Sequence, residues 1–438
     1  MKASFGGRGR LRYNANRMFV RTQPVTDGKA AMLELNRLTG QVVEMASALE
    51  GQQNNQRERT LRARQQLRDH ALVTEELLAK LQMAQDADQS WRGAEPLGQR
   101  LDQRSQVPPQ SEPATLVATD GSQIYPDTHA LALYYLTNVG TIVLRQDSGA
   151  APFTSTAPIL RLAVDDPLEE QDHDRVDADE VNLRRDLREM ETLAELAHAE
   201  RAALGGDMAR LVVALADGPL LPWLPQRMQD PEQRQRVQQF TAPLDNLRAS
   251  YTVPLGYVDR PRSANVLRLL YLAQLPVEAI SKERLRQRNE YDGLSDAALF
   301  QDLLPGQRTG LFAATSEINA NFAAAGHRIC FCYMNVAPPE EQDAAAPPEE
   351  RNAVMARIEL PQWIAGDPAR LDGALAAVWS DCRLLHYPYL LTRAHELALV
   401  TRQERATLEQ MLRTEMMRRG MRFEESPKAN TKRTIGGR

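Results

Sequence analysis

Two aspartate–glycine pairs are the residues of this chain whose type and position best suit chemistry. Asp120-Gly121 and Asp217-Gly218 each follow a short apolar run with the pattern of a buried strand. We expect each carboxylate to project at the end of its strand, where the glycine allows a sharp turn and the close approach of a ligand. Two such carboxylates on neighbouring strands would form a hard-oxygen site for Mg²⁺ or Mn²⁺. An isolated Asp-Gly is more often a simple turn, so the hypothesis rests on the pair.

A third carboxylate is expected from a long helix, at about residues 181–204, that lies between the two aspartates in the sequence. The apolar stripe of this helix consists of Leu183, Leu187, Met190, Ala194 and Ala197. Glu191 comes four residues after Leu187, so it lies on the flank of the stripe and could turn toward the sheet edge. Glu189 is expected to point the opposite way, and Glu195 remains a further possibility. Most acidic residues of such a helix are ordinary solvated charges.

A tyrosine and a histidine near the C-terminal end complete the candidate residues. Pro388 places Tyr387 in an extended conformation immediately before a helix. His395 then falls on the first turns of that helix, where a neutral imidazole could bind a metal or move a proton. Without further context, a single helical histidine is more often structural.

The elements that must position these residues follow an α/β pattern. Strands are predicted at residues 114–119, 131–136, 141–144, 210–216, 249–258, 328–336 and 356–360, with a turn at residues 138–140. Helices are predicted at residues 181–204, 263–271, 367–383 and 392–412. We expect these elements to form one main domain, residues 114–416.

The flanking segments have different compositions. Residues 28–102 are predicted to form a helical hairpin with a turn at Gly51, and residues 103–113 a linker rich in Pro, Gln and Ser. Residues 1–27 form a basic N-terminus without the apolar core of a secretory signal. An Ala/Pro/Glu-rich loop that ends near residue 350 is expected to be mobile, and the basic tail, residues 417–438, to be disordered.

Composition limits the class of protein. The 438 residues carry a formal net charge of −5, with 42% hydrophobic and 25% charged residues, which is typical of a globular protein. The negative charge argues against a protein that simply coats nucleic acid, but it is compatible with an enzyme that gathers carboxylates around a metal. Three cysteines are too few for a disulfide framework or a four-cysteine zinc site. No apolar run reaches membrane-spanning length, and we expect a cytoplasmic protein.

A series of segments in order resembles the NurA family of nucleases. Residues 118–126 (ATDGSQIYP) resemble the first motif of that family, and residues 215–220 (LADGPL) resemble the second. The further similar segments are residues 254–263 (PLGYVDRPRS), 303–308 (LLPGQR), 331–336 (FCYMNV), 356–363 (ARIELPQW) and 387–395 (YPYLLTRAH). The resemblance covers about residues 114–412. One departure is Pro219, where a small hydroxyl residue is common in the family.

The resemblance implies a ribonuclease-H-like mixed sheet flanked by helices, a divalent metal site, usually with Mn²⁺, and a homodimer. It also implies exonuclease and single-strand endonuclease activity in DNA end resection with HerA, a hexameric ATPase that translocates DNA. Carried over by position, Asp120 and Asp217 would be metal ligands, and Tyr387 and His395 would complete the active site. The match is poor between residues 165 and 204, so the choice of the helical ligand, Glu191, rests on the helix pattern.

The implied reaction is hydrolysis of a phosphodiester bond by metal-activated water. Asp120, Asp217 and Glu191 would hold one metal, and a second could arrive with DNA. Arg260 and Arg262 could hold phosphates, although exposed charge beside a proline turn explains them equally well.

Two aromatic residues lie just beyond the Asp-Gly pairs. Tyr125 and Trp223 could stack on bases, but we expect both to pack in the core.

Two other functions compete with this reading. A weakly catalytic or non-catalytic adaptor could dock on the hexameric translocase and guide DNA, although an adaptor has no need of paired strand-end aspartates. A ribonuclease or another phosphoesterase could share the same core, because nothing in the sequence separates DNA from RNA. For a nuclease that works with the hexameric ATPase, the hairpin within residues 28–102 is the expected docking surface.

Overall fold

The computed structural model of this chain describes residues 38–163, 176–224, 230–341 and 353–421. The predicted basic N-terminus, most of the acidic loop before residue 178, most of the Ala/Pro/Glu loop and nearly all of the C-terminal tail lie outside the described residues. The chain divides into two compact units, residues 1–55 and 56–438. All the candidate site residues belong to the second unit. Within the described ranges, no helix is long and apolar enough to cross a membrane.

Helices and strands alternate through the second unit, as the sequence predicts. The strands are β1 Ala94–Pro96, β2 Arg104–Gln106, β3 Thr115–Ile124, β4 Tyr134–Arg145, β5 Phe153–Leu162, β6 Val212–Asp217, β7 Val253–Asp259, β8 Gln307–Thr309, β9 Phe312–Ala314, β10 Ile329–Asn335 and β11 Met355–Pro361. The α-helices are α1 Thr39–Asp69, α2 Glu75–Ala87, α3 Ala178–Ala203, α4 Asp230–Ala249, α5 Asn265–Gln274, α6 Lys282–Arg286, α7 Asp296–Leu299, α8 Glu317–Ala324, α9 Gln362–Ala365, α10 Pro368–Cys382, α11 Tyr389–Ala398 and α12 Arg402–Arg418. Short 3₁₀ turns are η2 Val277–Ala279 and η3 Pro339–Glu341.

One mixed sheet organises the second unit. Its strands follow the order β1-β9-β10-β11-β7-β6-β3-β4-β5, with β2 and β8 attached beside β10. The pairs β3–β6 and β6–β7 are parallel, whereas β3, β4 and β5 form an antiparallel meander. The five strands β5-β4-β3-β6-β7, with helices α3 and α4 in their connections, form the expected ribonuclease-H-like core. Strands β11, β10, β9 and β1 extend that core by antiparallel pairing.

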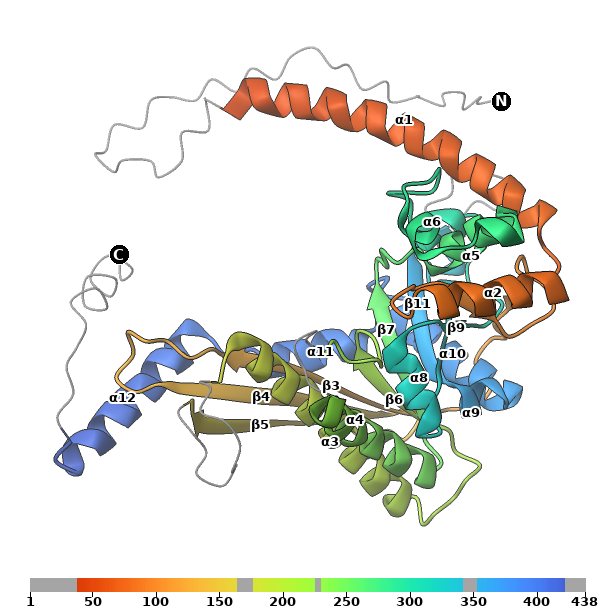
Figure 1. The fold of residues 1–438 in the computed structure, drawn as a ribbon. Helices are drawn as coiled ribbons and strands as arrows, with labels where there is room; N and C mark the ends of the chain where they lie inside the picture. Colours follow the sequence, from red (N-terminus) through yellow and green to blue (C-terminus); the bar gives the residue numbers. More distant parts are fainter. Residues whose placement is uncertain (1–37, 164–175, 225–229, 342–352, 422–438) are drawn as a thin grey trace, which may run out of the picture. The chain divides into compact units, whose positions relative to one another are not determined.

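The two faces of this core are covered by different helices (Figure 1). On one face, apolar residues of β3, β6, β7, β10 and β11 pack against α10 and α11. On the other face, Val117 of β3 and Val212 and Ala214 of β6 pack against α3 and α4. Side chains alternate along a strand, so Leu116, Ala118 and Asp120 face α11, whereas Val117, Thr119 and Gly121 face α3.

Two predicted breaks in the meander are absent from the structure. Strand β3 continues through Asp120 to Ile124 instead of ending at Asp120, because β4 pairs with it along its whole length, to Ile124. Strand β4 also runs unbroken through residues 138–140, where the sequence predicts a turn. Gly140 is therefore a strand residue, and it is needed for the close approach of α11 described below.

The N-terminal helices differ from the predicted hairpin. The turn expected at Gly51 is wrong, because α1 is continuous from Thr39 to Asp69. A glycine costs a helix only about 1 kcal/mol relative to alanine, and the Glu, Gln and Arg residues around Gly51 favour helix. The break comes instead at residues 70–74, where Thr74 caps α2.

The predicted linker is also corrected. Residues 103–113 contain β2, which pairs with β8, and β1 pairs with β9 within the segment assigned to the hairpin. Both pieces therefore belong to the main sheet.

The last predicted helix is two helices. Helix α11 ends at Ala398, and α12 begins after Thr401, whose side chain and that of Glu404 form a reciprocal capping box. This second start signal lies within an otherwise uninterrupted helical pattern.

Candidate active site

The two aspartates of the Asp-Gly pairs lie on neighbouring parallel strands. The register of β3 and β6 pairs Thr119 with Ala216, so Asp120 and Asp217 follow at adjacent positions. Both belong to the strand face that α10 and α11 cover, since Val213 and Leu215 of β6 also pack there. Asp120 is buried and Asp217 is exposed. The structure therefore brings together the carboxylates that the sequence predicts to converge.

Asp217 has an unusual electrostatic environment for a residue that reaches solvent. Its pKa is raised above the usual value, first by the loss of hydration and then by the negative charges of Asp120 and Asp259. A hydrogen bond from Tyr387 and the nearby His395 act in the opposite direction and lower this pKa. Such repulsion between close carboxylates is typical of a site that accepts a cation or shares a proton.

Helix α11 and the residue before its cap bring Tyr387 and His395 to these aspartates. The Nδ1 atom of His395 lies 2.6 Å from Oδ2 of Asp120, and the Tyr387 hydroxyl donates to Oδ1 of Asp217 at 3.0 Å. The edge of one ring meets the face of the other in the pair formed by Tyr387 and Tyr257 of β7, at 5.3 Å between centroids and an angle of 88°. Each aspartate thus has one aromatic or imidazole partner from the far end of the chain.

Close contacts between backbones fix α11 against β4. A side-chain carbon added at Gly140 would lie 2.4 Å from both the carbonyl oxygen of Ala394 and the nitrogen of Ala398. Asn138 donates from Nδ2 to the Ala398 carbonyl at 2.8 Å, and the Ser122 hydroxyl donates to the same oxygen. The helix that carries His395 is therefore held directly on β3, the strand of Asp120, and on its neighbour β4.

The N-terminal end of α11 is held by a partly buried carboxylate. Asp381, in α10, accepts a hydrogen bond from the backbone nitrogen of Leu390 at 3.0 Å. Burial raises the pKa of Asp381 to about 6, although this backbone hydrogen bond acts to lower it. Helices α10 and α11 are thus coupled close to Tyr387.

The helical glutamate nearest the site is Glu189, not Glu191. A side-chain carbon at Gly121 would meet Oε1 of Glu189 at 2.2 Å, and the Thr119 hydroxyl donates to the Glu189 backbone carbonyl at 3.2 Å. The expectation that Glu189 points away from the sheet edge is therefore wrong. Glu191 instead lies 3.3 Å from Arg188 with 43% of its side chain exposed, and Glu195 contacts the same arginine.

Two leucines of α3 explain why its buried face differs from the predicted one. Leu193, which the predicted stripe leaves out, is fully buried, whereas Leu187, a member of that stripe, is only partly buried. The apolar stripe is therefore rotated toward Glu189. Burial and the neighbouring charges of Asp186, Asp120 and Asp217 raise the pKa of Glu189 to about 8, against the effect of Arg185.

Arg185 connects this glutamate with the end of β3. Its Nε atom lies 3.1 Å from Oε1 of Glu189, and its Nη1 atom donates to Oε1 of Gln123 at 2.8 Å. Asp186 takes two further contacts from the same guanidinium. Nothing in the sequence distinguishes Arg185 from the other arginines of this helix, so its contact with the site could not be predicted.

The amino-acid sequence shows the family to which this chain belongs. Residues 114–400 match the NurA domain family. The chain is a member of the NurA family. No curated protein matches the chain at the level of sequence. Among solved structures, a similar chain is the NurA nuclease from Sulfolobus solfataricus, with 10% sequence identity and a TM-score of 0.44, covering 88% of this chain and 98% of that one.

The other residues predicted for this NurA chain lie at or near the surface. Arg260 directly follows β7, its side chain is 93% exposed, and its Nε atom lies 3.7 Å from Oδ2 of Asp259. Arg262 is also exposed. Tyr125 and Trp223 are exposed by 41% and 62%, so the expectation that both pack in the core is wrong. None of these four described residues forms a hydrogen bond or ion pair with Asp120 or Asp217.

Asp259 was missed by the sequence analysis although a signal was present. It is the last residue of a third apolar strand, and Asp217 pairs in register with Tyr257 two residues before it. Asp259 raises the pKa values of both Asp217 and Tyr387. Asp120 and Asp259, on the two strands that flank β6, therefore both act on Asp217 at this edge of the NurA core.

The donor chemistry of this edge suits a hard divalent cation. A carboxylate whose pKa is raised by neighbouring negative charges is stabilised in its charged form when a cation binds beside it. As they stand, however, no three His, Cys, Asp or Glu side chains among the described residues are arranged closely enough to hold a metal ion. Asp120 and Glu189 instead contact His395 and Arg185.

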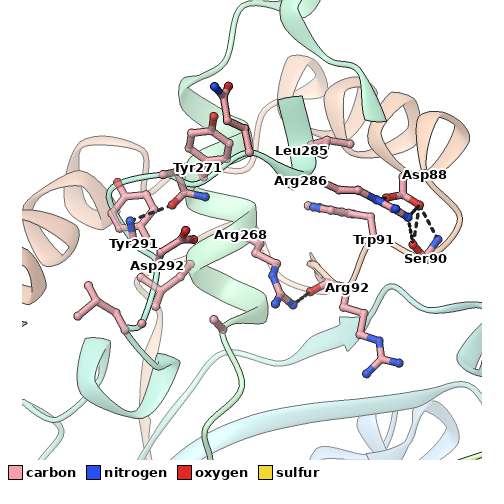
Figure 2. Close-up of a pocket in the computed structure, with 16 residues that line it drawn as sticks. Asp88, Ser90, Trp91, Arg92, Arg268, Tyr271, Leu285, Arg286, Tyr291 and Asp292 are labelled. Carbon is pink, nitrogen blue, oxygen red and sulfur yellow. Dashed lines mark hydrogen bonds and ion pairs between the residues drawn. The ribbon is translucent and has the colours of Figure 1, made fainter. Parts of the chain in front are cut away.

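A second hollow lies elsewhere and has a different character (Figure 2). It has a volume of about 360 Å³ and lies beside α5 and α6. Its cations are largely committed, because Arg286 pairs with Asp88 at 2.6 Å and Arg268 donates to the Arg92 carbonyl at 2.9 Å. It holds none of the carboxylates whose pKa is raised, so the chemistry is assigned to the sheet edge.

Proposed function

We propose that this chain is a metal-dependent nuclease that hydrolyses phosphodiester bonds in DNA, as an exonuclease and a single-strand endonuclease. The observation that supports the proposal most strongly is the contact of Asp120 with His395 and of Asp217 with Tyr387 in a member of the NurA family. Glu189 is the helical glutamate whose pKa is raised by burial and by the charges of both aspartates. Glu189 replaces Glu191 in the proposed ligand set. Mn²⁺ or Mg²⁺ is the proposed cation, because all three ligands are carboxylates.

The chain's own residues have separate tasks in this proposal. A bound cation would lower the pKa of a water molecule and stabilise charge on the phosphate. Tyr387 donates to Asp217 and so fixes the direction in which that carboxylate points. When Nδ1 of His395 carries its hydrogen toward Asp120, the Nε2 atom keeps a free lone pair and can take a proton from an approaching group. Arg260 and Arg262 are proposed to contact phosphates beside the site.

One assay tests the reaction. Purified protein is incubated with labelled linear duplex DNA, single-stranded DNA and RNA, each with Mn²⁺, Mg²⁺ or EDTA, and Asp120→Asn protein serves as the control. Cleavage of DNA that requires a cation and is lost in the variant is the expected result. Cleavage of RNA alone would support the ribonuclease alternative, and no cleavage of any substrate would support the adaptor.

We further propose that the chain acts as a homodimer with a HerA-like hexameric ATPase in the processing of DNA ends. A ring translocase would supply the DNA affinity that a chain of net charge −5 lacks. The first part of α1 is the proposed docking surface, because Val42, Val43, Met45 and Leu49 are all exposed there. Co-purification of the ATPase should be lost when Val42, Met45 and Leu49 are changed to serine. It should persist when the exposed Met411 and Met417 of α12 are changed in the same way.

A further inference from the structure

A groove lies between the end of β3 and the segment that follows α11. It has a volume of about 510 Å³. One wall is the segment from Gln123 to Thr128, which contains the last two residues of β3 and the loop after them. The other wall is the segment from Val400 to Arg405, which leads into the first turn of α12. Gln123 comes three residues after Asp120, which corresponds to about 10 Å along a strand. Val400 comes five residues after His395. Both walls therefore extend elements that carry residues of the site.

Tyr125 presents a fixed aromatic ring to this groove. Its hydroxyl accepts a hydrogen bond from Nε2 of Gln123 at 2.7 Å and donates to Oδ1 of Asn182 at 2.7 Å. The side chain is nevertheless 41% exposed. A ring that is anchored by its polar end and open to solvent loses little conformational entropy when a flat ligand stacks on it.

Arg402 supplies an available cation on the opposite wall. Arg405 is committed, because it lies 3.7 Å from Asp127 and 3.3 Å from Glu409. Arg402 is exposed, and the described part of the chain provides no ion pair or hydrogen-bond partner for its guanidinium. The capping box of Thr401 and Glu404 fixes the first turn of α12, so the position of Arg402 is defined by the helix. An aromatic ring and an uncommitted guanidinium across one groove match a nucleobase and a phosphate.

Hydrogen bonds connect the groove with the site. Gln123, which holds the Tyr125 hydroxyl, also accepts from Nη1 of Arg185 at 2.8 Å. Arg185 in turn contacts Glu189 at 3.1 Å. The stacking ring and the site carboxylate are thus tied to one guanidinium, which keeps the spacing between them constant.

We propose that this groove binds a single-stranded segment of the nucleic-acid substrate beside the scissile bond, with one base on Tyr125 and one phosphate at Arg402. The inference deepens the proposed nuclease function and rests on it. A single strand is required, because a base must be free of its own neighbours before it can stack on a side chain. The subsite sets the distance between that base and the phosphate that is cut.

Affinity for a labelled single-stranded oligonucleotide tests the proposal. It is measured by fluorescence anisotropy in EDTA and as the KM for cleavage in Mn²⁺. Tyr125→Ala should weaken binding roughly 5- to 150-fold, the range for loss of one base–aromatic stack, while Tyr125→Trp should retain most of it. Arg402→Ala should lower the slope of log affinity against log salt concentration by about 0.7, the value for one phosphate of a single strand. Tyr271→Ala and Arg268→Ala, in the hollow of Figure 2, are the matched controls and should change neither quantity.

A scan with abasic nucleotides locates the stacked base. Removing the base at one position should weaken wild-type binding as much as Tyr125→Ala does, and should have no further effect in that variant, because both changes delete the same contact. The sensitive position should lie a constant number of nucleotides from the cut. Wild-type cleavage with unchanged affinity in Tyr125→Ala and Arg402→Ala overturns this inference alone. Absence of any cleavage by the wild type overturns the proposed function, and the inference with it.

Discussion

The Nδ1 atom of His395 lies 2.6 Å from Oδ2 of Asp120, although the two residues are 275 positions apart in the chain. This contact joins β3, the central strand of the five-stranded core, to a helix that packs on it. A second contact, between Tyr387 and Asp217, joins the same C-terminal segment to the neighbouring strand. The two aspartates therefore depend on the docking of α11 for their orientation.

Replacing either aspartate with asparagine should abolish cation-dependent cleavage. Asp120→Asn and Asp217→Asn keep the side-chain shape but remove a negative ligand, and we expect a loss of at least about 100-fold. Removal of a residue that only orients a metal ligand already lowers metal affinity or activity by about 10- to 100-fold. The rate of cleavage with Mn²⁺ is measured together with the thermal midpoint, which should stay close to that of the wild type. A wild-type rate in either variant would remove that residue from the ligand set.

Among the helical glutamates, Glu189→Gln should impair cleavage far more than Glu191→Gln or Glu195→Gln. Only Glu189 lies against Gly121 and responds to the charges of both aspartates. The two control glutamates contact Arg188 near the surface, where an ion pair contributes about 0–1 kcal/mol to stability. Equal rates in the three variants would contradict the assignment of Glu189.

The raised pKa of Glu189, about 8 against a usual value of 4.5, predicts two effects of pH. Because the folded-state pKa is the higher one, the contribution to stability is complete below pH 4.5 and is lost as pH rises through 8. Glu189→Gln should therefore flatten the decline of the thermal midpoint over that range. Cation binding must release the proton, so Mn²⁺ affinity should increase with pH up to about 8 in the wild type and depend less on pH in the variant. Calorimetry in buffers of different ionisation enthalpy counts the released protons.

His395→Ala should lower kcat far more than it lowers affinity for DNA. The imidazole contacts Asp120 and is placed to act in the chemical step, which changes turnover and leaves ground-state binding largely intact. Single-turnover rates and binding in EDTA separate the two quantities. Parallel losses of binding and rate would indicate that His395 positions DNA or supports the fold.

Gly140→Ala should damage both stability and activity although Gly140 carries no functional group. The added carbon would lie 2.4 Å from backbone atoms of α11, so the helix must move away from Asp120. We expect a destabilisation of about 1–3 kcal/mol, the usual range for overpacking, together with slower cleavage. Gly51→Ala, which meets no atom within 4 Å in α1, is the matched control and should leave activity unchanged. Normal activity of Gly140→Ala would show that α11 is not held there.

The sequence allowed the strands and most helices of the core to be predicted, because apolar periodicity reports burial directly. It also singled out Asp120, Asp217, Tyr387 and His395, since residues beside strand ends and helix starts are recognisable locally. The sequence could not show how far neighbouring strands pair along one another. Asp120 lies within a strand, and residues 138–140 do not turn, because β4 pairs along the whole of β3 and the approach of α11 requires a glycine at position 140.

Which glutamate of α3 lies against the sheet depends on packing in the same way. Glu189 and Glu191 lie on opposite flanks of the apolar stripe, and a difference of one leucine in that stripe decides which flank meets the sheet. Arg185 carries no local signal that separates it from the other arginines of α3, and the position of Asp259 at a strand end does not by itself show that β7 pairs with β6. Their roles become visible only when β7 and α3 are placed beside Asp217 and Glu189.

The order of the site residues along the chain has a consequence for protein synthesis. All the proposed metal ligands precede residue 218, whereas Tyr387 and His395 are translated much later. A nascent chain that has left the ribosome only as far as α10 contains the carboxylates but lacks the helix that orients them. Domains form from the N-terminal end during translation, so the sheet can assemble before α11 exists. We therefore expect a ribosome-bound chain ending before residue 387 to cut no DNA, and the enzyme to gain activity only as its synthesis is completed.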